Sequence, residues 1–467
     1  MITTRARWIL GLAALASFMV ALDTLVVSTA LTTIRADLGA SIAELEWTVN
    51  AYNLTFGVLL MAAAALGDRY GRRRLFAAGI ALFAAASAAC ALAPDVGWLI
   101  AARAVQGIGA AFVMPLGLTL VSAAFAPERR GAAMGVLQGL TGLAVASGPI
   151  VGGAISQGGS WEWIFWVNVP IGVIAVPLVF ARMQESRGDE TTIDVRGLAL
   201  ITGAALGVVW GLVRGNAAGW GSLEVVASLA AGLALAAAFV AWQRRAAAPM
   251  FVPALFRAPG FAAGNAAIFF TFASLFAAVF FIAQFLQAGL GEDPLGAGLR
   301  LMPWTGTLFF VAPVAGLLVD RIGPRPLLVT GLALQAAGMA WVALLAEPGM
   351  GYGALVAPLM IAGMGISMAL PAAQSAAIGA VSAGAAGKAA GINSMLRELG
   401  GVFGIAVAVA VFAGAGGYAT AAVFTDGFTA AIGVSAALSL LGAAVGTRVP
   451  SRPREPLAAP LAEGSAA

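Results

Sequence analysis

The chain has 467 residues, of which 61% are hydrophobic and 10% charged, and its mean hydropathy is +0.95. These values exclude an ordinary soluble domain and indicate a polytopic membrane protein. The net charge is +4, but the arginines are scattered among short loops, so no nucleic acid is expected as a partner. With Cys90 as the only cysteine and no histidine, disulfides within the chain, Cys/His metal clusters and Ser-His or Cys-His catalysis are excluded.

The first apolar run extends from residue 8 to residue 31 and follows two arginines. Its start resembles a signal peptide, but the run is long enough to cross a bilayer, so we expect a first spanning helix that is not cleaved. The run contains the stretch MVALDTLVVSTAL, in which Asp23 lies near the middle of the helix. Ionisable residues inside spans are rare and mark ion or substrate pathways, so Asp23 is the first candidate for a proton carrier.

Charged and Gly/Pro-rich loops divide the chain into fourteen apolar stretches, each close to the ~20 residues that a spanning helix needs. The 60 glycines suit close packing between such helices. The predicted spans are 8–31, 47–66, 75–93, 97–121, 131–156, 162–181, 196–213, 223–243, 262–288, 296–319, 326–346, 351–376, 391–414 and 427–446.

The basic residues predict the orientation of these spans. With the N-terminus in the cytoplasm, most arginines fall in cytoplasmic segments, whereas the outer segments hold Arg35 and Arg214, with Arg300 near an outer helix end. This asymmetry satisfies the positive-inside rule. We therefore expect both termini in the cytoplasm.

Two similar stretches, LGDRYGRRRL after the second span and LVDRIGPRPL after the tenth, reveal an internal repeat. Their aspartates, Asp68 and Asp320, are 252 residues apart, and the same shift places the first span near Gly260. Chance recurrence of a basic turn is the alternative, but both copies fall in the same cytoplasmic connection of their half. Parallel halves of this kind indicate a transporter whose substrate site lies between them. The predicted domains are an N-terminal six-helix bundle at 1–181, a two-helix insert with cytoplasmic linkers at 182–260, a C-terminal six-helix bundle at 261–446 and a disordered cytoplasmic tail at 447–467.

The stretch GDRYGRRRL is more than a run of positive charge, because it also holds an acid and two glycines. It resembles the cytoplasmic motif of the major facilitator superfamily, with Ala64 in place of the leading glycine. The resemblance implies an all-α membrane fold, two six-helix bundles with two inserted central helices, in which this loop holds the cytoplasmic gate through charge and helix-dipole contacts. The predicted gate residues in the two copies are Gly67, Asp68, Arg69, Gly71, Arg72, Arg73, Asp320, Arg321 and Gly323.

The stretch RAVQGIG places Arg103 inside the fourth span. An arginine at this depth costs about 3 kcal/mol on insertion scales, so it normally faces the bundle interior and has a partner. The alternative is a side chain that extends to the outer headgroups, because Arg103 lies near the outer end of its helix. The stretch resembles a second motif of the superfamily, matched at Arg103, Gln106, Gly107 and Gly109, which implies a role in proton transfer.

The fifth span contains GVLQGLTGLAVASGPIVGG, a stretch rich in glycine. Packing is the commonest use of such glycines. The series nevertheless resembles the antiporter motif of the superfamily, with Ala144 where a further glycine is usual, and implies a kinked helix in an exporter that exchanges substrate for protons. The matching residues are Gly135, Gly148, Pro149, Gly152 and Gly153.

Three further stretches, LDTLVVSTALTTIRADL, EWTVNAYNL and WEWIFWVNVPIG, resemble the fourteen-helix drug:proton antiporter family of the EmrB/QacA type. The resemblance covers nearly the whole chain, although Thr32 replaces the usual proline after AL. It implies that Asp23 takes part in proton coupling and in cation recognition.

All of the 21 acidic residues except Asp23 and Glu398 can be placed in loops or at the ends of the predicted spans. Glu398 follows Arg397, so a structural ion pair and a proton-coupling role are both open for it. Amide and aromatic residues on the inward faces of the spans would suit a bulky amphipathic ligand bound without strict geometry. The predicted cavity residues are Asn50, Tyr52, Asn53, Gln138, Phe269, Phe272, Phe276, Gln284, Gln287, Trp304 and Asn393.

These observations predict a secondary transporter and not an enzyme: a proton-coupled antiporter that exports hydrophobic or amphipathic compounds, cationic ones included. The alternative in the same class is a dedicated exporter of one endogenous metabolite, antibiotic or lipid. A membrane receptor or enzyme would need a large soluble domain or a catalytic cluster, and neither is visible. We expect a monomer in a bacterial inner membrane, with the lipid bilayer and small molecules as partners, protons as the coupling ion and no cofactor or metal.

Overall fold

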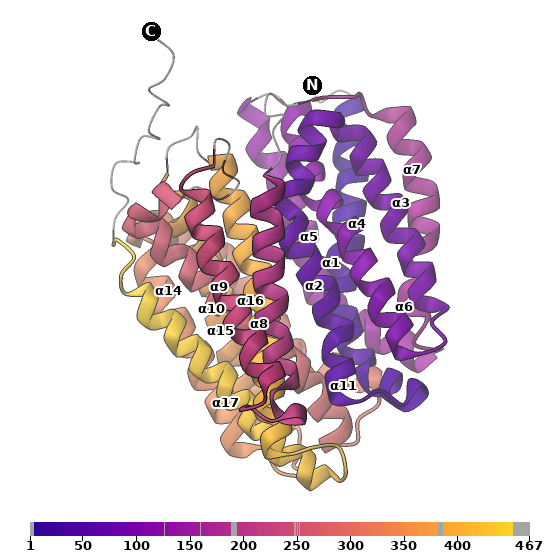
Figure 1. The fold of residues 1–467 in the computed structure, drawn as a ribbon, viewed down its shortest axis with the longest axis vertical. Helices are drawn as coiled ribbons and strands as arrows, with labels where there is room; N and C mark the ends of the chain where they lie inside the picture. The colour runs from indigo at the N-terminus through magenta and orange to yellow at the C-terminus, as the bar shows by residue number, and fades with distance from the viewer. Residues whose placement is uncertain are drawn as a thin grey trace.

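The computed structural model describes residues 4–125, 127–158, 160–187, 194–246, 249, 251, 253–381 and 386–451, apart from some side chains within these ranges. The predicted tail therefore lies outside the described part from residue 452 onward. Long helices make up nearly all of the described chain and run side by side in two halves (Figure 1).

The N-terminal half is built from five long helices and two shorter ones. Helices α2 and α4 start before the apolar runs that predict them, because polar residues cap them: Ser41 and Glu44 form a capping box at the start of the second helix, and Asp95 caps the fourth. The helices are α1 (Thr4–Leu38), α2 (Ile42–Tyr70), α3 (Arg72–Ala91), α4 (Val96–Ala124), α5 (Pro127–Gly158), α6 (Trp163–Trp166) and α7 (Asn168–Arg182).

Two central helices, α8 (Val195–Ala218) and α9 (Leu223–Gln243), form a hairpin with Asp194 and Ser222 as N-caps. Helix α8 packs against α2 of the first half and α16 of the second. Val209 of α8 lies in one apolar cluster with Val58 of α2 and Val402 of α16. The inserted pair therefore contacts both halves through α8.

The C-terminal half repeats the arrangement with more breaks. The predicted span 296–319 is divided into three helices, because Pro303 lacks a backbone N–H and glycine follows at Gly306. The elements are η1 (Pro253–Arg257), α10 (Pro259–Gln284), the π-helical η2 (Phe285–Gly289), α11 (Pro294–Arg300), α12 (Met302–Thr305), α13 (Thr307–Ile322), α14 (Pro324–Leu345), α15 (Gly353–Ile378), α16 (Ala386–Ala415) and α17 (Ala421–Gly446).

Within the described residues, 12 helices are long and apolar enough to cross a membrane. Helix α2 is bent, and if its two parts, Ile42–Leu60 and Ala62–Tyr70, form one span the number becomes 13. Helix α5 has 32 residues and packs along α1. The fold is thus an all-helical, multi-pass membrane fold.

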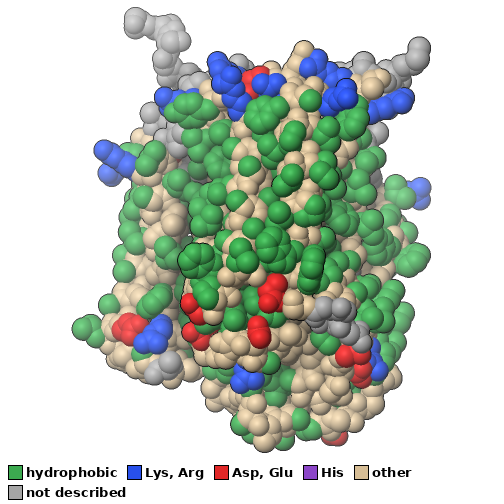
Figure 2. Space-filling view, turned by 90° about the vertical axis from the view of Figure 1, so that its right-hand side faces the viewer, with side chains coloured by type: hydrophobic (Ala, Val, Ile, Leu, Met, Phe, Trp, Pro, Cys, Tyr) green, Lys and Arg blue, Asp and Glu red, His purple; other side chains and the backbone are tan. Residues whose placement is uncertain are grey.

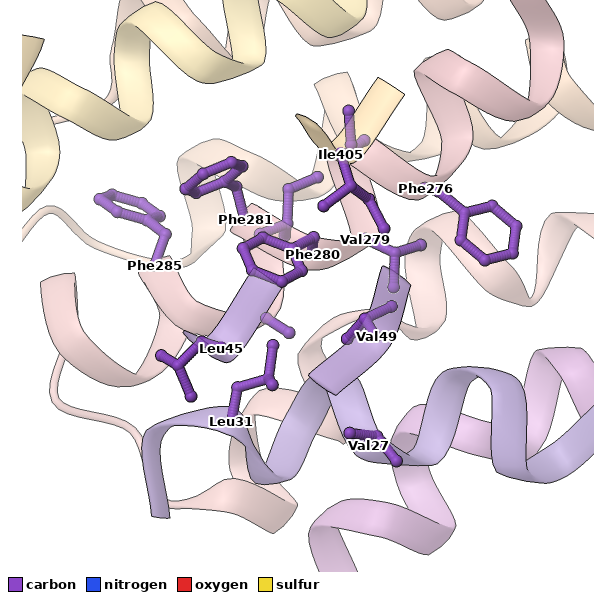
Figure 3. Packing of buried hydrophobic residues seen from close by; sticks show 14 of the residues in the cluster. Val27, Leu31, Leu45, Val49, Phe276, Val279, Phe280, Phe281, Phe285 and Ile405 are labelled. Carbon is purple, nitrogen blue, oxygen red and sulfur yellow. The ribbon is translucent and has the colours of Figure 1, made fainter. Parts of the chain in front are cut away.

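The two halves meet where α2 packs on α16, α1 on α10 and α5 on α11. Figure 3 shows the apolar part of this contact, where Val27 of α1 and Val49 of α2 lie near Val279 and Phe280 of α10 and Ile405 of α16. All five side chains are buried. Lipid is as apolar as these side chains, so close packing and not exclusion from water holds the halves together here.

Charge is distributed unevenly between the two ends of the molecule. In Figure 2 a broad apolar surface separates two charged rims, and most of the visible Lys and Arg side chains gather at the rim where the N-terminus lies in Figure 1. We call this rim the basic end; it contains the junction of α2 and α3 at Gly71, with Arg69 at the end of α2 and Arg72, Arg73 and Arg74 at the start of α3.

Candidate functional site

Asp23 lies on α1 and is 1% exposed. Arg103 of α4 donates from Nη1 to Asp23 Oδ2, and both side chains are excluded from solvent. Two amides complete the carboxylate's shell: Gln106 Nε2 donates to Oδ1 at 3.0 Å and Asn168 Nδ2 donates to the same oxygen at 3.2 Å. Both carboxylate oxygens are therefore occupied by donors from α4 and α7.

Arg103 points into the N-terminal half and not toward the headgroups, so the alternative of a snorkelling arginine is wrong for this structure. Its Nε donates to the backbone carbonyl of Thr48 at 3.0 Å, and its Nη1 also donates to Gln106 Oε1 at 2.6 Å. The guanidinium carbon lies 4.2 Å from the ring centre of Tyr52, a cation–π contact. Three kinds of partner thus hold the arginine besides Asp23.

Ser87 of α3 binds the two amides that donate to Asp23. Its hydroxyl accepts from Gln106 Nε2 at 2.6 Å and from Asn168 Nδ2 at 3.1 Å. Sequence reasoning misses Ser87 and Asn168 as functional residues, although Asn168 is a lone amide within the apolar stretch WIFWVNVPIG. Such an isolated amide in a span is the signal that could have found it.

The glycines of the RxxQGxG stretch determine how closely α4 approaches its neighbours. A methyl group at Gly109 would lie 2.7 Å from the backbone nitrogen of Phe83 on α3, and one at Gly107 would overlap the Tyr52 carbonyl on α2. Both contacts are too close for a real side chain. These glycines therefore bring α2 and α3 against α4, at the level where Arg103 reaches Asp23.

The antiporter-motif glycines that the structure describes serve helix packing. A methyl group at Gly152 would lie 2.8 Å from Val26 Cγ2 on α1, and one at Gly153 would lie 2.8 Å from Leu295 Cα on α11. Gly148 is buried on the same helix. Gly153 thus belongs to a close contact between the two halves. The surroundings of Gly135 and of the side chains of Gln138, Pro149 and Asp320 lie outside the described part of the chain.

The predicted gate loop makes its described contacts within the N-terminal half. Asp68 accepts from Arg72 Nε at 2.7 Å, and Glu185, which follows α7, accepts from the backbone N–H of Arg73 at 2.9 Å. Gly71 has a φ of 114°, which a residue with a side chain rarely adopts. A methyl group at Gly67 would overlap Leu116 of α4.

The second copy of the motif shares the backbone feature. Gly323 has a φ of 83° and connects α13 to α14, as Gly71 connects α2 to α3. In both halves, therefore, the backbone at this position adopts a positive φ, which favours glycine. Arg321 of this copy is exposed and Arg69 of the first stacks on Tyr70, at 5.2 Å from its ring centre.

Glu398 of α16 is 4% exposed and pairs with Arg397, whose Nη2 lies 2.8 Å from Glu398 Oε1. The pair lies at the contact between the halves, because a methyl group at Gly57 of α2 would be 2.6 Å from Glu398 Cβ. This geometry matches the structural ion pair that was one of the two alternatives for Glu398.

The predicted cavity residues fall into different environments. Tyr52 belongs to the Asp23–Arg103 centre, and Gln287 joins the halves by donating to the Thr29 carbonyl of α1 at 2.9 Å and accepting from Thr32. Asn50 and Asn53 are fully buried on the α2 face toward α16. The remaining residues lie within the C-terminal half: Gln284 accepts from Tyr418, Asn393 donates to Asn265, Phe269 contacts Phe403, Phe272 lies near Arg397, Phe276 lies against Gly401, and Trp304 packs under Gly363.

One buried acid is absent from the sequence-based prediction. Glu46 is fully buried on α2. That helix begins at Ile42 and not at residue 47, where the predicted span starts, so Glu46 lies inside the helix. Asn50 Nδ2 donates to Glu46 Oε1 at 3.0 Å. The Ser41–Glu44 capping box is the sequence signal that would have moved the helix start and placed Glu46 inside the span.

Two helical halves, with a buried ion pair inside the N-terminal one, are typical of a polytopic transporter, and comparison with known proteins agrees. The family model described as Major Facilitator Superfamily matches residues 13–404 and, in a second match, residues 264–466. This chain belongs to the major facilitator superfamily. It is therefore a membrane transporter and not an enzyme.

Relatives and solved structures resemble the chain over most of its length. The tetracenomycin C resistance and export protein of Streptomyces glaucescens is 35% identical over 392 residues, which cover 83% of this chain and 72% of that protein. The cephamycin export protein CmcT of Amycolatopsis lactamdurans is 34% identical over 418 residues, covering 88% and 85%. The crystal structure of a D-xylose-proton symporter has a TM-score of 0.68 at 16% identity, covering 95% and 98%, and shows the shared fold.

Proposed function

We propose that this transporter is a proton-coupled antiporter that exports hydrophobic or amphipathic compounds, cationic ones included, by alternating access between its halves. The observation that carries the proposal is Asp23, a carboxylate excluded from solvent in an apolar span and paired with Arg103. A buried ion pair seldom adds net stability relative to apolar residues. A role in ion movement therefore explains this pair better than a structural role.

The groups around the pair allow Asp23 to take up and release a proton reversibly. When Asp23 takes up a proton, Arg103 loses its counter-charge but keeps the Thr48 carbonyl, Gln106 and the face of the Tyr52 ring. Both protonation states of the carboxyl group thus leave the arginine with partners. One proton moving down 100 mV supplies about 2.3 kcal/mol, which an antiporter spends on moving substrate the other way.

The relatives support export as the direction of transport, since two of them are named for the export of an antibiotic. These names also favour a second candidate function, a dedicated exporter of one antibiotic or metabolite. The two candidates differ in the number of compounds that the protein moves. Transport of chemically unrelated cations would exclude the dedicated exporter.

The proposal includes a placement in the membrane. The basic end faces the cytoplasm under the positive-inside rule, with both termini on that side of a bacterial inner membrane. Twelve candidate spans, the bent α2 and the long α5 together support the fourteen-helix subtype of the EmrB/QacA kind. We propose a monomer as the transporting unit.

Uptake of ethidium and of tetraphenylphosphonium into everted membrane vesicles tests the function. Wild type is expected to accumulate both compounds when the vesicle interior is acidic and to stop when the gradient is collapsed. Asp23→Asn, which keeps the shape of the side chain, is expected to lose the response to the gradient. Uptake that ignores both the gradient and the substitution would contradict antiport.

A further inference from the structure

Glu46, Asn50 and Asn53 form one polar strip on α2. Their spacing of four and then three residues places them on the same helix face. All three side chains are fully buried. A strip of three buried polar residues in a span is unusual, because each of their polar atoms needs a partner there.

Most polar atoms of the strip have no partner. Asn50 Nδ2 donates to Glu46 Oε1 at 3.0 Å. Glu46 Oε2, Asn50 Oδ1 and both amide atoms of Asn53 have no hydrogen-bond partner among the described groups. Buried polar atoms in native proteins are normally satisfied, and exceptions call for an explanation such as a missing ligand.

The strip faces the C-terminal half of the molecule. Gly57, one turn further along the same face, lies against Glu398 of α16. Apolar contacts between the halves run along both sides of the strip: Val49 packs toward α10, and Leu54 packs with Val402 of α16. The strip is therefore enclosed at the junction between the halves, where a transporter of this architecture binds its substrate.

Glu46 also differs in its charge balance from Asp23 and Glu398, the other two buried acids among the described side chains. Asp23 is paired with Arg103, and Glu398 with Arg397. No described cationic side chain pairs with Glu46. Arg103 lies on the other side of α2, where it contacts the Thr48 carbonyl, and the charged pair on α16 lies beyond Gly57. A carboxylate without a cation at this junction is suited to a cation that arrives with the substrate.

We propose that Glu46, Asn50 and Asn53 form a binding site for the ammonium group of an exported amine, separate from the Asp23–Arg103 centre. The inference rests on the proposed export function. The vacant atoms are three acceptor oxygens and one amide donor, so the site favours a ligand with several N–H groups. Asp23 has no vacant oxygen. It carries the proton, while Glu46 holds the substrate.

The test measures the binding of three probes that share the dansyl group to the purified full-length protein in lipid nanodiscs. Dansylcadaverine carries a primary ammonium group, its N,N,N-trimethyl derivative carries the charge without N–H donors on the charged group, and dansyl amide is neutral. Glu46→Gln is expected to raise the Kd of dansylcadaverine by about tenfold or more, since a charged hydrogen-bond partner is lost. The trimethyl derivative is expected to lose less, and dansyl amide to bind unchanged.

A second variant and a control guard against a folding defect. Asn53→Ala removes two unpartnered amide atoms from the strip and is expected to weaken dansylcadaverine binding alone. Gln335→Ala removes an equally buried and unpartnered amide from α14 in the C-terminal half and is expected to leave all three Kd values unchanged. Glu46→Asp keeps the charge and is expected to restore part of the affinity.

Two results would overturn the site. One is a Kd for dansylcadaverine that stays within about twofold of wild type in both Glu46→Gln and Asn53→Ala, which is below the weight of one hydrogen bond. The other is equal weakening of all three probes in Glu46→Gln, which would make Glu46 a structural or proton-binding group. Gradient-driven uptake is measured separately in vesicles. Binding that depends on Glu46 with uptake that ignores the gradient would reject antiport and keep the site.

Discussion

Arg103 donates a hydrogen bond to Asp23 across the contact between α4 and α1, and neither side chain reaches solvent. The two residues are 80 positions apart in the chain and meet because α1 packs against α4. The carboxylate has two further donors, and the arginine has two further acceptors and an aromatic face. The pair is therefore a closed centre within the N-terminal half.

Removal of one partner of this pair is expected to cost more than removal of both. Arg103→Met leaves an uncompensated buried carboxylate and is expected to lower the free energy of unfolding by about 3–5 kcal/mol. The double variant Asp23→Asn, Arg103→Met removes both charges and is expected to recover most of that loss. Thermal unfolding in detergent measures both. If the double variant loses as much stability as Arg103→Met, or more, the two charges do not depend on each other.

The close approach of α3 and α4 gives a prediction with a built-in control. Gly109→Ala would push a methyl group into the backbone of Phe83 and is expected to cost about 1–3 kcal/mol of stability, because the helices must move apart. Gly139→Ala on α5 meets nothing within 4 Å and is expected to be neutral. Melting temperatures of the two variants check this. A Gly109→Ala protein as stable as wild type would show that α3 and α4 adjust freely.

Gln287 joins the halves at the end away from the basic end, where it bonds to Thr29 and Thr32 of α1. Gln287→Ala removes these bonds and is expected to let the halves part more often there. A cysteine placed at Val49, which is buried between the halves, reports the opening by its rate of maleimide labelling. We expect the rate to rise about threefold to tenfold, as the loss of roughly one hydrogen bond implies. The native Cys90 is fully buried and serves as the internal reference. An unchanged rate would assign the closure of this end to the apolar contacts alone.

The proposed amine site in the polar strip of α2 predicts a change of selectivity in transport as well as in binding. In everted vesicles with an acidic interior, Glu46→Gln is expected to slow the uptake of dansylcadaverine several-fold at low concentration and to spare that of tetraphenylphosphonium, which has no N–H donor. Equal slowing of both compounds would place Glu46 in the proton path or the gate and not in the amine site.

The sequence predicts much of the fold because its signals are those of the bilayer itself. Apolar runs of sufficient length, arginines at one end and a repeated Asp-Arg-x-Gly turn lead to the helices, the halves and the glycines Gly71 and Gly323 with positive φ. The breaks in α11 to α13 escape prediction, because Pro303 and Gly306 sit in an otherwise apolar run and local packing decides whether a helix continues.

The sequence predicts several single residues of the candidate site, but it does not predict which of them contact one another. The rarity of charge in spans points to Asp23, Arg103 and Glu398 without showing which of them pair. The partners of Asp23 come from α4 and α7, so only packing reveals them. Glu46 escapes because hydropathy starts its helix one turn late, and its unpaired state depends on what the C-terminal half brings to the junction.

The central claim is that Asp23 couples substrate movement to a proton, and proton movement itself is the most direct test. Everted vesicles are loaded with an acidic interior, and an acridine dye reports the pH gradient while ethidium is added. The account predicts that ethidium dissipates the gradient in vesicles with wild-type protein and leaves it intact with Asp23→Asn. Transport of ethidium by wild type with no movement of protons, or an equal proton flux in the variant, would contradict it.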